Sequence, residues 1–197
     1  RSRGLGDVYK RQALLAVGPT HAGKSTLCGA ALAAGGAVVS DDSVILGRDA
    51  GGAPSVGALR RDLWIRDGSV ELLPKLLHAQ LREISSFGER RWGLERAAFQ
   101  EVFRTRVQPQ AIVLLHRDLR VRGFALRRVS SAKGLVGLIL ASSALFLSGR
   151  YKQERERCMP VLVALTNSVP CFELRMGRAL VEDPAATVRR LVEDACS

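Results

Sequence analysis

Short apolar segments alternate with glycine-rich turns and helical patterns along the chain. Ala13–Val17 and Ala111–Leu115 are continuous apolar runs, of the kind found in strands that are buried on both faces. Ser25–Ala34 combines small and apolar residues and is followed by Gly35 and Gly36, which predicts a buried helix that ends there. Strands that alternate with helices in this way predict an α/β domain.

The segment after the first predicted helix contains two acidic residues between two apolar stretches. Ala37–Ser40 and Ser43–Leu46 are predicted strands, and Asp41 and Asp42 interrupt them. The glycine-rich stretch Gly47–Gly57 that follows is typical of a flexible connection inside a domain.

The second half of the chain is predicted to close the domain. Ser130–Ser148 includes an uncharged run of 16 residues, which is shorter than the roughly 20 needed to span a bilayer and favours a buried helix. Cys171–Arg175 is a predicted strand, and Pro184–Ala195 is a predicted amphipathic helix with Pro184 in its first turn. Leu59–Arg106 is rich in arginine, and its pattern supports no assignment.

Composition limits the class of protein. The chain has 197 residues, four cysteines and a net charge of +11. The cysteines form no CxxC pair, which disfavours zinc and predicts reduced thiols in a cytoplasmic protein. The positive charge points to an anionic partner, but its arginine pairs are dispersed, so the sequence disfavours nucleic acid and favours nucleotide phosphates or an acidic peptide.

Residues 1–12 differ in character from the rest and resemble translated adaptor sequence from a sequencing library. They show no strand or helix period and no signal-peptide core. Since the chain begins with Arg1, we expect the natural start to be missing, with a single domain over residues 13–197. The alternative is a genuine basic N-terminal arm.

A phosphate-binding loop follows the first predicted strand. The residues from Gly18 to Ser25 match the pattern GxxxxGK[ST], and they stand between a strand and a helix as that pattern requires. Its glycines let successive N–H groups converge on phosphate oxygens, and the helix N-terminus adds a positive dipole end. Lys24 would reach the β- and γ-phosphates, and the Ser25 hydroxyl would ligate Mg²⁺. The predicted nucleotide-binding residues are Gly18, Pro19, Thr20, His21, Ala22, Gly23, Lys24, Ser25 and Thr26.

Such a loop needs an acidic partner for the metal. His116 stands at the end of the strand Ala111–Leu115, where that acid is often found, and Asp118 follows in a predicted turn. Asp41 and Asp42 are better candidates, because a break in the chain there would turn both toward the phosphates. One would hold Mg²⁺ and the other would accept the proton of an attacking hydroxyl. The alternative is a turn in which the two carboxylates bond to their own backbone.

The loop Gly18–Thr26 followed by Gly35–Leu46 (GGAVVSDDSVIL) resembles the kinase domain of HPr kinase/phosphorylase. It is closer still to the small HPr-kinase-like proteins of bacterial peptide-modification gene clusters, whose core is similar to that of ATP-dependent phosphoenolpyruvate carboxykinases. Ala111–Arg117, Ser130–Leu147 and Val169–Arg178 fall where that family has a strand, a helix and a terminal strand. The loop interior differs from the family's glycine-rich GxSGxGKS, since it contains Thr20, His21 and Ala22.

The resemblance implies a P-loop α/β fold with a mixed sheet flanked by helices, and ATP- and Mg²⁺-dependent transfer of the γ-phosphoryl group to a hydroxyl. The acceptor that it favours is a serine of a peptide or protein, and no membrane partner is implied. Carried over from the family, Lys24, Asp41 and Asp42 are catalytic, with Asp41 the base and Asp42 joining Ser25 at the metal. A nucleotide-binding regulatory module without kinase activity and a small-molecule kinase are the alternatives, and a homo-oligomer stays open.

Overall fold

The computed structural model describes residues 13–59, 62–73, 75–86, 89–95, 104–118, 120–142 and 152–196. The N-terminal segment 1–12, including its interpretation as adaptor or basic arm, lies outside these described residues.

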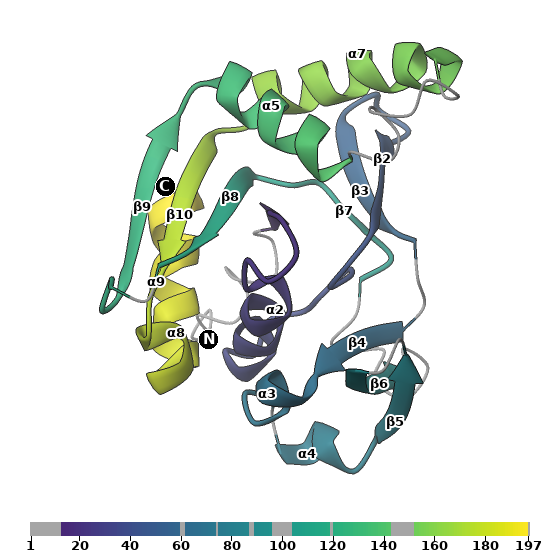
Figure 1. Ribbon diagram of the computed structural model, residues 1–197. Helices are drawn as coiled ribbons and strands as arrows, with labels where there is room; N and C mark the ends of the chain where they lie inside the picture. Colours follow the sequence, from purple (N-terminus) through teal and green to yellow (C-terminus); the bar gives the residue numbers. More distant parts are fainter. Residues whose placement is uncertain are drawn as a thin grey trace, which may run out of the picture.

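A four-stranded mixed sheet forms the centre of the fold (Figure 1). Its strands, in spatial order, are β1 (Leu14–Val17), β8 (Ala111–Arg117), β10 (Cys171–Met176) and β9 (Phe124–Val129). The first three run parallel, and β9 is antiparallel to β10. In β8 every residue from Ala111 to Leu115 is buried, as expected for a continuous apolar strand that is covered on both faces.

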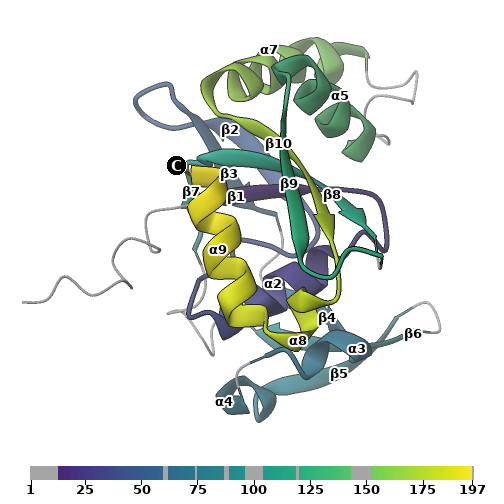
Figure 2. The same cartoon turned by 90° about the vertical axis from the view of Figure 1, so that its left-hand side faces the viewer.

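Helices cover both faces of this sheet (Figures 1 and 2). On one face, α5 (Ser131–Ala141) and α7 (Lys152–Ser168) pack with Ile112 and Leu114. On the other face lie α2 (Lys24–Ala33), α8 (Ala179–Glu182) and α9 (Pro184–Cys196), which pack with Val113 and Leu115. The sequence-based expectation of an α/β protein with a mixed sheet flanked by helices is therefore confirmed at this level.

Two small antiparallel sheets complete the described structure. One contains β2 (Val44–Arg48), β3 (Pro54–Ala58) and β7 (Arg106–Val107). The other contains β4 (Asp62–Arg66), β6 (Glu89–Glu95) and β5 (Leu81–Ser86), with the short helices α3 (Asp67–Val70) and α4 (Lys75–His78) in its first connection. Leu63, Ile65 and Leu94 of this sheet form a buried cluster with Leu32 of α2. The β4–β6 sheet thus packs against the helix that follows the phosphate-binding loop.

Two local predictions were wrong. Ala37–Ser40 does not form a strand, and Val38 makes a single bridge in which its carbonyl accepts from the Arg104 N–H at 3.0 Å. The apolar side chain of Val38 packs in the cluster that contains Leu63 and Leu94. Val38 is therefore buried although it does not belong to a strand. Gly47–Gly57 is a hairpin between β2 and β3, in which the Asp49 carboxylate accepts from the N–H groups of Gly51 and Ala53 at 2.9 Å.

The predicted helix Ser130–Ser148 corresponds to α5, which ends at Ala141 with Ser142 as its C-cap, and residues 143–150 lie outside the described part of the chain. It is not fully buried, since the Val136 and Leu140 side chains are 54% and 64% exposed. Its apolar residues cover the sheet on one side only. In the part of the chain that the structure describes, no helix is both long enough and apolar enough to cross a membrane.

Candidate phosphate-binding site

The chain between β1 and α2 has the geometry that its glycines predict. Gly23 has a φ of 97° at the position before α2, a left-handed conformation that glycine adopts without strain. A Cβ atom on Gly18 would lie 2.9 Å from Cβ of Ala22, so the loop closes on itself only with glycine there. His21 also has a positive φ, of 66°, which is uncommon for a residue with a side chain. The loop therefore curls tightly at the carboxyl end of β1.

The first turn of α2 presents unsatisfied backbone donors. No side chain caps the helix, and the first intrahelical bond runs from the Leu27 N–H to the Gly23 carbonyl at 2.9 Å. The N–H groups of Lys24, Ser25 and Thr26 precede that bond and have no acceptor within the helix. Together with the helix dipole, such donors are able to bind an anion, and phosphates often occupy helix N-termini of this kind.

Lys24 lies over the loop. Its Nζ donates to the carbonyl oxygens of Gly18 and Pro19, each at 2.9 Å. An ammonium group has three N–H donors, so one remains for an anion at the helix N-terminus.

The two acidic residues lie in a bend and have different environments. Asp41 is 8% exposed, and its Oδ2 accepts a hydrogen bond from the Trp64 N–H at 3.2 Å. Asp42 is exposed, and its carboxylate accepts from the Ser43 hydroxyl at 3.4 Å. These bonds are to the Trp64 backbone and the Ser43 side chain, so the alternative of a turn in which both carboxylates bond to their own backbone stays a prediction.

The pKa of the Cys28 thiol in α2 depends on both Asp41 and Lys24. Desolvation raises the pKa of its thiol to about 12, the negative charge of Asp41 raises it further, and the positive charge of Lys24 opposes the rise. Both charges therefore act on the same residue of α2, one turn beyond Lys24. The Cys28 Sγ also donates to the Ser40 carbonyl at 3.9 Å, so the segment that carries Asp41 lies beside α2.

The segment from β4 to α3 forms hydrogen bonds with the loop, with α2 and with the acidic bend. Arg66 Nη1 donates to His21 Nδ1 at 2.9 Å, which requires the proton of that ring to be on Nε2 because arginine has no acceptor. Ser69 and Thr26 of α2 share a hydroxyl–hydroxyl bond of 3.3 Å. Sequence reasoning missed Arg66, because it is one of many arginines in a region without a clear pattern. Only the packing of β4 beside α2 singles it out.

The residues at this site fit a magnesium–nucleotide complex. Ser25 provides a hydroxyl in the first turn of α2, and Asp42 provides an exposed carboxylate in the neighbouring bend. Among the described residues, no three His, Cys, Asp or Glu side chains gather as a metal-binding cluster. The Ser25 hydroxyl and the Asp42 carboxylate are oxygen ligands of the kind that Mg²⁺ takes, usually one or two from the protein together with phosphate oxygens and water.

Comparison with known proteins adds no relative to this picture. No protein-family model matches the chain, and no curated protein or solved structure matches it. The function is therefore argued from the geometry of the residues themselves.

Proposed function

We propose that the chain is an ATP- and Mg²⁺-dependent kinase that transfers the γ-phosphoryl group to a hydroxyl, with a serine of a peptide or protein as the favoured acceptor. The observation that carries this proposal is the uncapped start of α2, with Lys24 over the loop and Asp41 beside the same helix. The resemblance of the loop and the acid pair to HPr kinases supports the same fold family and the same reaction.

Each residue of the site has a part in this reaction. The amides of Lys24, Ser25 and Thr26 bind phosphate oxygens, and the Lys24 ammonium reaches the β- and γ-phosphates. The Ser25 hydroxyl and the Asp42 carboxylate would hold Mg²⁺, which would supply positive charge to neutralise the phosphates. Arg66, placed at the loop by its bond to His21, adds positive charge where the transferred group develops negative charge.

The transfer itself needs one proton acceptor. The acceptor oxygen forms a bond to the γ-phosphorus while the bond from that phosphorus to the β–γ bridging oxygen breaks, and ADP leaves. The proton of the hydroxyl passes to the Asp41 carboxylate. Burial of Asp41, and the Trp64 N–H that fixes it, hold this base in one orientation.

The test is transfer of ³²P from γ-labelled ATP to a library of serine-containing peptides. Lys24→Ala and Asp41→Asn are expected to reduce transfer by about 100-fold or more, because each removes a group that acts in the transition state. Lys75→Ala and Asp194→Asn, which alter exposed residues of α4 and α9, serve as matched controls and should transfer at the wild-type rate. Undiminished transfer in both site variants would overturn the proposal.

A further inference from the structure

A second polar feature lies at the carboxyl ends of β8 and β10. A shallow groove of about 520 Å³ is lined by His116, Arg117, Asp118, Arg120, Glu173 and Arg175. The groove is built from the strand that adjoins β1 and from the next strand in the sheet. The phosphate-binding site does not use these side chains.

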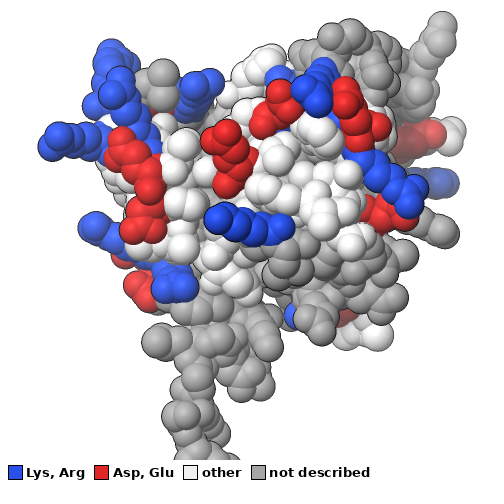
Figure 3. Space-filling view, turned by 90° about the horizontal axis from the view of Figure 1, so that it is seen from below, with Lys and Arg blue, Asp and Glu red and all other residues white. Residues whose placement is uncertain are grey.

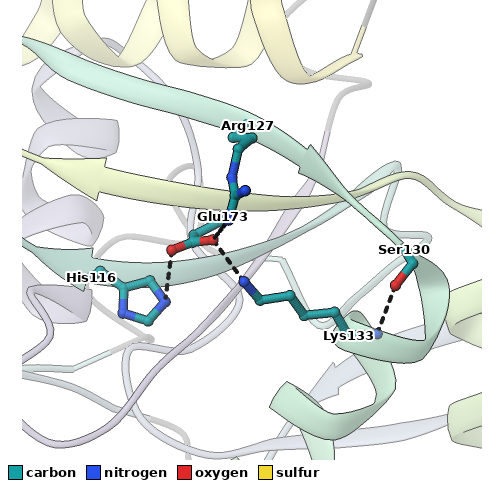
Figure 4. Close-up of polar contacts among 5 residues, drawn as sticks. All are labelled: His116, Arg127, Ser130, Lys133 and Glu173. Atoms are coloured by element: carbon teal, nitrogen blue, oxygen red, sulfur yellow. Dashed lines mark hydrogen bonds and ion pairs between the residues drawn. The ribbon is translucent and has the colours of Figure 1, made fainter.

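Internal pairs satisfy the two carboxylates of the groove. Glu173 is 8% exposed and accepts from Arg127 Nη2 at 2.6 Å and from Lys133 Nζ at 2.8 Å, with His116 Nε2 at 3.8 Å (Figure 4). Asp118 pairs with Arg120 Nε at 3.0 Å. Neither carboxylate therefore needs a cation from outside the protein.

Positive charge remains after these pairs are made. Within the described part of the chain, neither Arg117 nor Arg175 forms an ion pair. The charge of Arg175 is nevertheless one of the causes that lower the pKa of Asp118, after its hydrogen bonds with Arg120. Both residues are exposed, Arg117 as the last residue of β8 and Arg175 as the last but one of β10. With Arg120, Arg127 and Lys133, five cationic side chains face two carboxylates, so the groove favours an anion.

The groove lies at the end of the sheet, close to the loop Gly18–Ser25. A Cβ atom on Gly18 would lie 3.1 Å from Cβ of Leu115, the residue before His116. A Cβ atom on Gly23 would lie 2.8 Å from Cε of Met176, the residue after Arg175. Strand alternation places Arg175 on the face of Glu173 and Leu114, which α5 covers, and Arg117 on the face of Leu115 and Met176, which α2 covers. The groove therefore crosses the end of the sheet from one face to the other, beside the loop.

We propose that this groove binds the carboxylates of an acidic segment in the acceptor peptide, through Arg117 and Arg175. This inference rests on the proposed kinase function in one respect, namely that the bound peptide is the one that receives the phosphoryl group. Guanidinium groups bind carboxylates through paired hydrogen bonds, and an open groove admits an extended chain. A peptide bound in the groove lies beside the loop. Binding of its acidic residues there would select serines that have acidic neighbours.

Peptide binding without nucleotide tests this inference independently of transfer. The probes are a fluorescein-labelled serine peptide with Asp and Glu at its flanks and the same peptide with Asn and Gln, measured by fluorescence anisotropy. Wild type is expected to bind the acidic peptide about tenfold more tightly, as one or two charged hydrogen bonds provide. The Arg117→Ala/Arg175→Ala variant should bind both peptides equally. Arg157→Ala/Arg189→Ala, which removes exposed charges from α7 and α9, should retain the preference.

Three further binding measurements separate the possible outcomes. Arg117→Lys/Arg175→Lys keeps the charge and should retain part of the preference, which covers the case in which the alanine variant fails to fold. Lys24→Ala should bind the acidic peptide normally even where transfer is lost, so failure of the kinase proposal stays distinguishable. Equal binding of both peptides by wild type would overturn the inference, as would displacement of the acidic peptide by inorganic phosphate or Mg²⁺–ATP.

Discussion

Three contacts join the arginine-rich middle of the chain to the phosphate-binding site. The Trp64 N–H fixes Asp41, Arg66 reaches His21 in the loop, and Ser69 bonds to a threonine in the first turn of α2. The sequence identifies the loop and the acid pair directly, because their spacing is set by the backbone geometry that phosphate binding needs. It does not identify Arg66, because its partner His21 is 45 residues away and no local pattern joins them.

At this scale we predict that Arg66→Ala lowers the turnover number for phosphoryl transfer by about 100-fold, while the KM for ATP changes little. The reason is that Arg66 adds charge that the transition state uses more than the ground state does. Arg66→Lys should recover only part of the rate, because lysine lacks the planar fork. The measurement is steady-state kinetics at varied ATP, with Arg82→Ala in the exposed β5 as control. A wild-type turnover number in Arg66→Ala would assign Arg66 a structural part only.

The elements around Glu173 are held together by charge. Arg127 of β9, Lys133 of α5 and His116 of β8 all face this residue of β10 (Figure 4). Hydrogen bonds from Lys133 and then Arg127 hold the pKa of the Glu173 carboxyl at about 2, well below its ordinary value of 4.5. Since the pKa is lowered on folding, the stability that it contributes is present above pH 4.5 and is lost as the pH falls toward 2.

We therefore expect Glu173→Gln to flatten the fall in stability between pH 4.5 and about 2. The measurement is urea denaturation at a series of pH values for wild type and for the variant. Glu182→Gln, at an exposed position of α8, is the matched control and should keep the wild-type slope. Parallel pH curves for wild type and Glu173→Gln would contradict this account of Glu173.

The turn after β10 depends on a missing side chain. A Cβ atom on Gly177 would lie 1.7 Å from the Val121 carbonyl oxygen, and the Gly177 N–H donates to the Gly123 carbonyl at 2.9 Å. Gly177→Ala is expected to lower the free energy of unfolding by about 1–3 kcal/mol, because neighbouring backbone must move. Gly123→Ala meets no atom within 4 Å and should change it by less than about 1 kcal/mol. Equal thermal unfolding curves for both variants would contradict the close approach.

The sequence predicts those elements whose apolar pattern matches their burial. β1, β8 and α9 were predicted because their apolar patterns match burial in strand or helix form. Ala37–Ser40 failed as a strand because Val38 is buried by packing alone, and β4–β6 were missed because exposed arginines interrupt their alternation. Pairing between distant strands is set by the whole fold, and a local window of sequence does not contain it.

At the scale of the molecule, the charge of +11 comes from basic residues that are dispersed along the sequence. On the face seen from below, basic and acidic side chains of the described residues lie interspersed (Figure 3). The described residues of this face do not present the continuous basic patch that a nucleic-acid backbone needs, whereas a small or local anion needs only a few basic groups. The two anion sites argued above, at the start of α2 and in the β8–β10 groove, are of that kind.

The central claim is that the chain couples loss of the γ-phosphate from ATP to formation of a phosphoester. The most direct measurement counts both products in one reaction with Mg²⁺–ATP and a serine peptide library, ADP by chromatography and phosphopeptide by mass spectrometry. Wild type is expected to form one ADP for each phosphoserine, and Lys24→Ala is expected to form neither product above background. Nucleotide binding that depends on Lys24 with no phosphopeptide formed would contradict it and would identify the chain as a nucleotide-binding module.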